Sequence, residues 1–207
     1  MSFINYHLKM EEEISLIMNS DRKPGLLLHA CCAPCSSYVI ELLHKFFNIT
    51  VYFYNPNIYP EDEHNRRFSE LEHFLKSAGY SETVGILYEN YSPMDFAACA
   101  RGFEDESEGG QRCFNCYDLR LSKTAEKAKA SGFDYFTTTL TISPHKNAQV
   151  INLTGEKLAE LYEVKFLYSD FKKKEGYKRS VELSSGFGLY RQDYCGCKFS
   201  FKKKITE

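Results

Sequence analysis

The stretch Gly25-Leu26-Leu27-Leu28-His29-Ala30-Cys31-Cys32-Ala33-Pro34-Cys35 decides the fold class and marks the candidate site. Its first part is short, almost entirely apolar and preceded by Pro24, which predicts a buried strand over residues 25–30. We expect His29 within this strand to be a hydrogen-bonded core histidine. A helix is predicted over residues 36–47, because apolar residues recur there at helical spacing and Ser36 can serve as its N-cap.

The same alternation of short apolar runs and longer amphipathic segments continues along the chain. Further strands are predicted at residues 49–54, 84–88, 134–138 and 165–168, and further helices at residues 61–78, 116–130 and 149–161. Strands that are separated by helices long enough for crossover connections indicate a parallel sheet with helices on both faces. The predicted fold class is therefore α/β.

The domain organisation is predicted to be simple. We find no internal repeat and no break in composition, so the expectation is a single α/β domain over residues 1–207. Residues 1–23 form an N-terminal extension to which we assign no chemistry, and residues 101–111 are expected to form a loop or lid. Residues 170–207 lack clear periodicity and are predicted to be an irregular C-terminal appendage over the sheet edge.

Composition excludes several classes of protein. With 207 residues and 43% hydrophobic residues, the chain can bury a substantial core without disulfides. No secretory signal is recognisable, and no run approaches the roughly 18 apolar residues of a membrane span, so we expect no membrane association and a cytoplasmic location. In a reducing compartment, grouped cysteines indicate metal binding or redox cycling rather than structural disulfides. The net charge of −2 provides no global attraction to nucleic acid.

All but one of the eight cysteines fall into three tight groups. These groups are Cys31-Cys32-Ala33-Pro34-Cys35, Cys113-Phe114-Asn115-Cys116 and Cys195-Gly196-Cys197. The first group follows the first strand, and ligands of parallel sheets bind beyond the carboxyl ends of the strands. The second group lies near the start of a helix, where the helix dipole favours thiolate. Both groups are therefore expected at one edge of the sheet, whereas Cys99 is expected to be a small buried hydrophobe.

The spacing of these cysteines leaves several kinds of chemistry open. A single CxxC pair fits half a zinc site, half an iron–sulfur site or a thioredoxin-like redox pair. An iron–sulfur cluster takes four thiolates, and four cysteines would complete one: Cys31, Cys32, Cys113 and Cys116. Cys35, Cys195 and Cys197 then remain for a second task. Cys195 and Cys197 could chelate a second metal or cycle between dithiol and disulfide, and the sequence does not separate these alternatives.

Residues other than cysteine also suggest roles at this edge. His145 and Lys146 follow the fourth predicted strand and could donate protons or bind phosphate, although Pro144 before them could simply open a helix. Asp170 is a candidate acid or outer partner of a metal site. The exit of the second predicted strand carries candidates for polar substrate contacts, where turn formation alone would also explain the asparagines: Asn55, Asn57 and Arg66.

Local basic runs flank the third cysteine group. Lys172-Lys173-Lys174 precedes it and Lys202-Lys203-Lys204 follows it, with Tyr190 and Arg191 interleaved. Such runs are often only solvated surface. Together with the aromatic residues, they also suit a surface that binds phosphates and stacks on bases.

The cysteine groups and their neighbours resemble the epoxyqueuosine reductases of the QueH type. Matching stretches run in order through residues 25–200: His29-Ala30-Cys31-Cys32-Ala33-Pro34-Cys35, Tyr54-Asn55-Pro56-Asn57-Ile58, Glu108-Gly109-Gly110-Gln111-Arg112-Cys113-Phe114-Asn115-Cys116-Tyr117, Phe136-Thr137-Thr138-Thr139-Leu140, Ser143-Pro144-His145-Lys146, Asp170-Phe171-Lys172-Lys173 and Leu189-Tyr190-Arg191-Gln192-Asp193-Tyr194-Cys195-Gly196-Cys197. The resemblance implies a nucleotide-hydrolase-like (HUP, Rossmann-like) α/β fold. It also implies reduction of the epoxide of epoxyqueuosine, at the wobble position of tRNA, to the alkene of queuosine.

The resemblance further implies a set of cofactors and partners. It assigns a four-iron, four-sulfur (4Fe-4S) cluster to Cys31, Cys32, Cys113 and Cys116, and a redox-active pair to Cys195 and Cys197. An additional iron is associated with the family, and Cys35 is our candidate ligand for it. The partners would be the tRNA anticodon loop, bound by the polar and basic residues named above, and an unidentified electron donor.

Two other interpretations of these motifs remain. A zinc-stabilised RNA-binding module without catalysis would explain the CxxC pair and the lysine runs, but it leaves Cys35, Cys195 and Cys197 without a task. A nucleotide-using thiolation enzyme of similar fold would need a glycine-rich phosphate loop after the first strand. This chain has cysteines and a proline at that place, which disfavours the second alternative.

Overall fold

A five-stranded parallel sheet forms the centre of the computed structural model, which describes residues 4–201. The strand order is β3-β2-β1-β4-β5. The strands are β1 (Gly25–His29), β2 (Asn48–Phe53), β3 (Gly85–Tyr88), β4 (Tyr135–Thr138) and β5 (Lys165–Phe166). All neighbouring strands pair in parallel, and Leu28 of β1 is in register with Val51 of β2 and Thr137 of β4. The predicted α/β class is confirmed.

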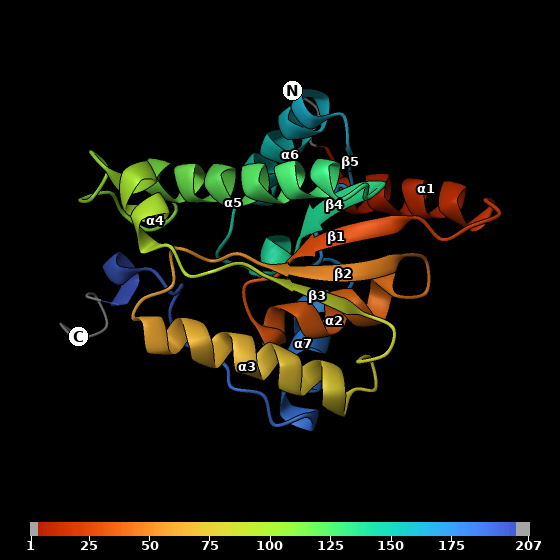
Figure 1. The fold of residues 1–207 in the computed structure, drawn as a ribbon, viewed down its shortest axis with the longest axis horizontal. Coiled ribbons are helices and arrows are strands. Elements are labelled where there is room, and N and C mark those ends of the chain that lie inside the picture. The colour runs from red at the N-terminus through yellow and green to blue at the C-terminus, as the bar shows by residue number, and fades with distance from the viewer. Residues whose placement is uncertain (1–3, 202–207) are drawn as a thin grey trace.

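Helices cover both faces of this sheet. They are α1 (Tyr6–Met18), α2 (Ala33–Leu43), α3 (Glu61–Ser77), α4 (Pro93–Ala100), α5 (Gln111–Ala130), α6 (Ala148–Tyr162) and α7 (Gly176–Gly186), and a 3-10 turn, η1 (Thr139–Ile142), follows β4. Helices α2, α3 and α7 lie on one face of the sheet, and α5 and α6 lie on the other (Figure 1). The two-sided cover agrees with the prediction.

The consecutive leucines of β1 supply both hydrophobic cores. Because successive strand residues point to opposite faces, Leu26 and Leu28 pack on the side of α1, α2 and α3, whereas Leu27 packs with Leu121 of α5 and Ile151 of α6. All three leucines are fully buried. His29 is a buried core histidine as predicted, since its ring bonds to the Thr138 hydroxyl (2.9 Å) and the Tyr54 carbonyl (3.1 Å).

Two predicted helix starts were wrong. Helix α2 begins at Ala33, because Pro34 suits the first turn of a helix; Ser36 therefore does not cap it but donates to the Cys32 carbonyl over 2.8 Å. Helix α5 begins at Gln111 rather than at Cys116. The CxxC pair consequently lies wholly within the first turns of α5.

Three helices were not predicted: α1, α4 and α7. Helix α7 lies within residues 170–207, so the described part of this segment is less irregular than expected. Its buried face is made of small residues, Gly176, Ser180 and Ser184, and therefore shows no apolar periodicity. After α7, the chain returns along α3 toward α4 (Figure 1). The second lysine run, residues 202–204, lies outside the described residues.

The topology places a crevice at the carboxyl ends of β1 and β4. The chain leaves β1 toward β2 on one side, and its later strands β4 and β5 lie on the other side. Such a reversal of strand order opens the crevice in which α/β proteins bind ligands. The strand arrows in Figure 1 point to the side where α4 and the last described residues lie. Within residues 4–201, no helix combines the length and the apolar character needed to cross a bilayer.

Candidate metal and redox centre

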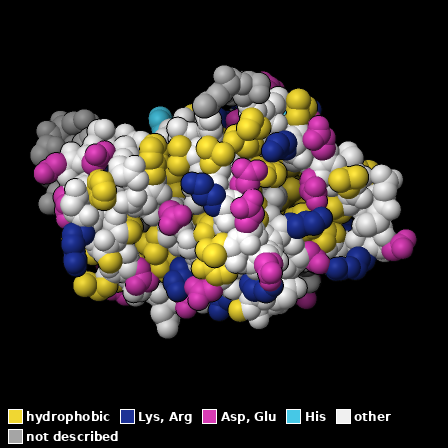
Figure 2. Space-filling model, turned by 90° about the horizontal axis from the view of Figure 1, so that it is seen from above, with side chains coloured by type: hydrophobic (Ala, Val, Ile, Leu, Met, Phe, Trp, Pro, Cys, Tyr) yellow, Lys and Arg dark blue, Asp and Glu magenta, His cyan; other side chains and the backbone are white. Residues whose placement is uncertain are grey.

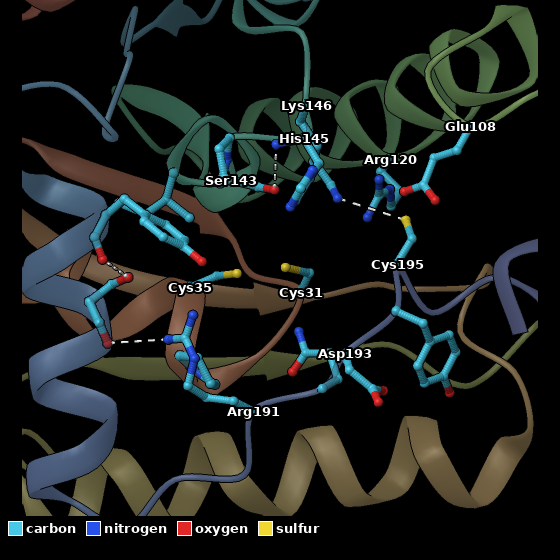
Figure 3. Close-up of a pocket in the computed structure, with 17 residues that line it drawn as sticks. Cys31, Cys35, Glu108, Arg120, Ser143, His145, Lys146, Arg191, Asp193 and Cys195 are labelled. Carbon is cyan, nitrogen blue, oxygen red and sulfur yellow. Dashed lines mark hydrogen bonds between the residues drawn. The ribbon is translucent and has the colours of Figure 1, made fainter. Parts of the chain in front are cut away.

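A cavity of about 490 Å³ occupies this crevice (Figure 3). Cys31, Pro34 and Cys35 form one wall, at the junction of β1 and α2. Residues 142–146, which end η1 and follow it, form another wall, and residues 191–195 close the cavity from the C-terminal segment. The cavity therefore gathers segments that are far apart in the sequence.

The first cysteine group forms a compact set of sulfurs. The Sγ atoms of Cys31, Cys32 and Cys35 all lie within 4.8 Å of one another, and those of Cys31 and Cys32 are 3.7 Å apart. The abrupt change from strand to helix brings them together, because Cys32 is the N-cap of α2 and Cys35 lies in its first turn. The Gln192 amide donates to the Cys32 sulfur over 3.1 Å. This set could hold a metal ion.

Hydrogen bonds within the set concentrate negative charge on one sulfur. The Cys32 and Cys35 thiols lower the pKa of Cys31 well below its usual range, and the charges of Lys146 and Arg120 add to this effect. In return, the bond to Cys31 raises the pKa of Cys32 to about 12. Since a thiolate is the form that binds metals, Cys31 could act as a metal ligand.

The second cysteine group lies at the N-terminus of α5. The Gly109 N–H donates to the Cys113 sulfur over 3.3 Å. Burial nevertheless raises the pKa of Cys113 and raises that of Cys116 to about 11. The expectation that thiolate would be favoured here was wrong, because loss of hydration on burial raises both pKa values.

The third cysteine group borders the cavity through Cys195. The Cys195 sulfur is 3.7 Å from the Lys146 ammonium, and Cys195 interacts electrostatically with both Cys113 and Cys116. Cys197 packs with Cys116 in a small apolar cluster that half-buried Cys99 also joins. All eight cysteines lie within the described residues and none is in a disulfide.

Two buried arginines that the sequence analysis did not single out accompany the sulfurs. Arg120 of α5 lines the cavity and is 2% exposed, and Arg67 of α3 is 1% exposed. Burial opposes the charge of Arg120, yet its pKa is raised through Cys116, Cys195 and Cys31. Its position, one helical turn after Cys116, is the signal that could have identified it.

The comparison with protein families bears directly on this centre. The model of the family described as "Epoxyqueuosine reductase QueH" matches residues 26–203, a range that contains every cysteine. The chain belongs to the QueH family. The suspected resemblance is therefore confirmed.

Curated QueH relatives extend this match over nearly the whole chain. The protein named epoxyqueuosine reductase QueH from Streptococcus pyogenes serotype M1 is 47% identical over 201 residues, which cover 96% of this chain and 79% of the relative. The QueH proteins of Staphylococcus epidermidis (41% identity, 97% of this chain, 86% of the relative) and Thermotoga maritima (35%, 86% and 91%) are similar as well. As a member of this family of reductases, the chain is an oxidoreductase.

The structure places some predicted site residues of this QueH chain at the cavity and others away from it. His145, Lys146 and Arg191 line the cavity. Asp170 does not line it, and its carboxylate pairs with Lys172 instead. Of the two predicted acids, His145 is thus the one at the cavity.

The candidates at the exit of β2 divide into buried and exposed residues. Asn55 and Asn57 are buried, and the Asn55 amide donates to the Ala30 carbonyl over 2.8 Å. Asn55 therefore fixes the backbone directly before Cys31. Arg66 is exposed and its guanidinium lies 3.4 Å from the centroid of the Tyr190 ring.

The lysine run at residues 172–174 is largely neutralised by acids. Lys172 pairs with Asp170 and Lys174 with Glu11, while Lys173 is exposed and has no ion pair within residues 4–201. Figure 2 shows acidic and basic side chains interleaved on the face seen from the side of α5 and α6. The run is therefore a weaker phosphate-binding surface than its sequence suggested.

Proposed function

We propose that this chain reduces epoxyqueuosine to queuosine at the wobble position of tRNA. The observation that carries the proposal is the set of Cys31, Cys32 and Cys35 sulfurs, within 4.8 Å of one another beside a cavity, in a member of the QueH family. Its relatives are named epoxyqueuosine reductases. The cavity volume of about 490 Å³ is suited to a nucleoside-sized ligand.

The chemistry of the donors, which are all thiols, suits an iron–sulfur centre, and three of these sulfurs already lie together: those of Cys31, Cys32 and Cys35. We assign a 4Fe-4S cluster to Cys31, Cys32, Cys113 and Cys116, with Cys35 as the ligand of an additional iron. Clusters held by thiolates carry net negative charge, and the cations of Arg120 and Lys146 lie where they would compensate it. When bound, such a centre supplies single-electron transfer and a Lewis acid for an epoxide oxygen.

The residues of the chain supply the remaining chemistry. Converting an epoxide to an alkene consumes two electrons and two protons and releases water. Oxidation of Cys195 and Cys197 from dithiol to disulfide provides two electrons and two protons, and an external donor, still unidentified, restores the dithiol. His145, exposed at the cavity wall, protonates the leaving oxygen.

Recognition of tRNA uses the rim of the cavity. An anticodon loop offers unstacked bases to aromatic and guanidinium groups. Tyr177 and Arg191 line the cavity, and the Arg191 guanidinium carbon lies 5.8 Å from the centroid of the Tyr177 ring. Lys173 and Arg66 are exposed for phosphate contacts, and Tyr190 supports Arg66. With tRNA as substrate and free thiols at the site, we place the enzyme in the cytoplasm.

Metal content and turnover of anaerobically purified protein test the proposal. We expect iron and acid-labile sulfide, broad visible absorption, and conversion of RNA that contains epoxyqueuosine. Cys113→Ala abolishes both the absorption and the turnover, whereas the matched Cys99→Ala keeps both. A fully active Cys113→Ala protein, or iron-free protein that turns over, contradicts the proposal. Protein that holds only zinc and binds RNA without turnover would instead support the non-catalytic RNA-binding module.

A further inference from the structure

Arg67 is a buried cation whose surroundings connect it to the third cysteine group. Its Nε donates to Glu63 over 2.7 Å, and its Nη1 donates to the Cys195 carbonyl over 3.3 Å. The guanidinium also lies 5.2 Å from the centroid of the Tyr194 ring, so it joins α3 to the segment that carries the third cysteine group. A buried cation is costly unless it is paired, and Arg67 takes its partners from both of these segments.

The backbone at Gly196 is shaped around this guanidinium. Gly196 has φ = 115°, and a Cβ there would lie 2.9 Å from Arg67 Nη1. The Gly196 carbonyl in turn accepts from the Tyr59 N–H over 2.7 Å. Arg67 and Tyr59 thus hold the Cys195-Gly196-Cys197 segment from two sides, and only glycine fits between them.

The charge of Arg67 acts on the sulfurs as well as on the backbone. Arg67 interacts electrostatically with Cys32 and Cys31, and it also acts on Cys195, where the effects of Lys146 and Arg120 are larger. Its only ion-pair partner in residues 4–201 is Glu63, which also accepts from the Tyr190 hydroxyl over 3.2 Å. Glu63 therefore accepts hydrogen bonds from both Arg67 and Tyr190, and no second carboxylate within residues 4–201 pairs with Arg67.

We infer that Arg67 is a positioning residue that holds Cys195 and Cys197 in place and shifts their equilibrium toward the dithiol form. The inference rests on the proposed redox role of this pair. The hydrogen bond to the Cys195 carbonyl and the close fit at Gly196 hold the segment in a conformation in which both thiols are free, and a cation nearby favours this reduced form over the uncharged disulfide. A stabilised reduced state makes the disulfide more oxidising. Arg67 thereby keeps the pair reduced between turnovers.

A thiol–disulfide titration of the full-length, iron-reconstituted protein tests this inference under anaerobic conditions. Oxidised dithiothreitol takes two electrons and two protons from the Cys195 and Cys197 thiols, which form a disulfide while dithiothreitol becomes a dithiol. Trypsin releases the peptide of residues 192–198, which contains these two cysteines and no other. Isotope-coded alkylation of this peptide reports the redox state without any measurement of turnover.

Substitutions at Arg67 separate its charge from its hydrogen bond. In Arg67→Gln, which keeps a donor but loses the charge, we expect the equilibrium constant for oxidation to rise about tenfold, which corresponds to about 30 mV. Arg67→Lys restores the charge and returns the constant to within about threefold of the wild-type value. The matched control is Arg66→Gln, which removes a cation from the adjacent, exposed position and leaves the constant unchanged.

Each outcome of the titration is decisive. An unchanged constant in a folded Arg67→Gln protein overturns the inference, and so does an equal change in Arg66→Gln. If Arg67→Gln does not fold, Arg67→Lys decides: a tenfold change despite the retained charge overturns the inference. Wild-type protein that forms no Cys195–Cys197 disulfide at any ratio of oxidised to reduced dithiothreitol overturns both the inference and the proposed redox role of the pair. An unchanged constant in Arg67→Gln overturns the inference alone, so the two failures are distinguishable.

Discussion

The ammonium of Lys146 lies 3.7 Å from the sulfur of Cys195, although 49 positions separate the two residues in the sequence. One residue follows η1 and the other follows α7, so this contact ties the C-terminal segment to the edge of the sheet. The Cys197 thiol, followed by the charges of Lys146 and Arg120, lowers the pKa of Cys195 well below its usual range. We therefore expect Cys195 to be the more reactive sulfur of its pair, with the Cys197 thiol as its hydrogen-bond donor.

Removing the charge of Lys146 should change the pH dependence of the alkylation of Cys195. In Lys146→Met the Cys195 sulfur loses a neighbouring cation and its pKa rises, so we expect the pH profile of its alkylation rate with iodoacetamide to move to higher pH. Mass spectrometry of the peptide of residues 192–198 measures the rate at each pH. Lys173→Met, which removes an exposed lysine, should leave the profile unchanged. An unaltered profile in Lys146→Met would show that the ammonium does not act on this thiol.

The sheet could be predicted from the sequence because its signals are local. The leucines of β1 and the helices between the strands fix the α/β class, and the position after β1 fixes the first cysteine group at the carboxyl edge. Helix α1 was not predicted but could have been, because four residues that are buried in the structure recur at helical spacing: Tyr6, Met10, Ile14 and Ile17. Helix α7 could not be predicted from apolar periodicity, because small and polar residues form its buried face.

The electrostatics of the site could be predicted only in part. Of two adjacent arginines on α3, sequence reasoning selected exposed Arg66, whereas buried Arg67 lies at the sulfurs. Arg67 precedes the core residue Leu71 by one helical turn, so helical phase already placed it on the inward face. Arg67 was nevertheless not predicted to be buried, because charged residues are rarely buried unless they are paired. Pairings such as Lys172 with Asp170 depend on rotamers and remain outside the reach of sequence patterns.

Binding of tRNA should depend on salt, and individual lysines should contribute unequally. Since Lys173 has no ion pair among the described residues, Lys173→Ala should reduce the slope of log affinity against log salt by about one. Lys174 already pairs with Glu11, so Lys174→Ala should change the slope by less than half as much. Fluorescence anisotropy with an anticodon stem-loop over a range of salt concentrations measures both. Equal slopes for the two variants would argue against a phosphate contact at Lys173.

Stability should fall as the pH drops below about 6.5, the ordinary pKa of histidine, partly because of His64. His64 is 1% exposed among the rings of Phe53, Tyr88 and Tyr91, and burial lowers its pKa. Below the ordinary pKa, the unfolded chain binds a proton at this histidine and the folded chain does not. The free energy of unfolding therefore decreases as the pH falls.

His64→Gln tests this contribution by removing the titrating group. We expect the urea midpoint of His64→Gln to vary less between pH 7 and pH 5 than that of the wild type. His73→Gln, at an exposed position on the same helix, should follow the wild-type dependence. A His64→Gln protein with the full wild-type dependence would assign the effect to other groups.

Packing of α6 on β5 should depend on the absence of a side chain at Gly155. A Cβ at this position would lie 2.4 Å from the Phe166 ring, which is itself fixed by Phe136 and Tyr168 on β4 and after β5. Overpacking costs about 1–3 kcal/mol, whereas replacing glycine by alanine in a helix gains at most about 1 kcal/mol, so Gly155→Ala should lower the free energy of unfolding by about 1–2 kcal/mol. Gly186→Ala is the matched control, because a Cβ there meets no atom within 4 Å and should leave the stability unchanged or slightly raised. Urea denaturation measures both variants, and a Gly155→Ala protein as stable as Gly186→Ala would mean that the Phe166 ring has room to move.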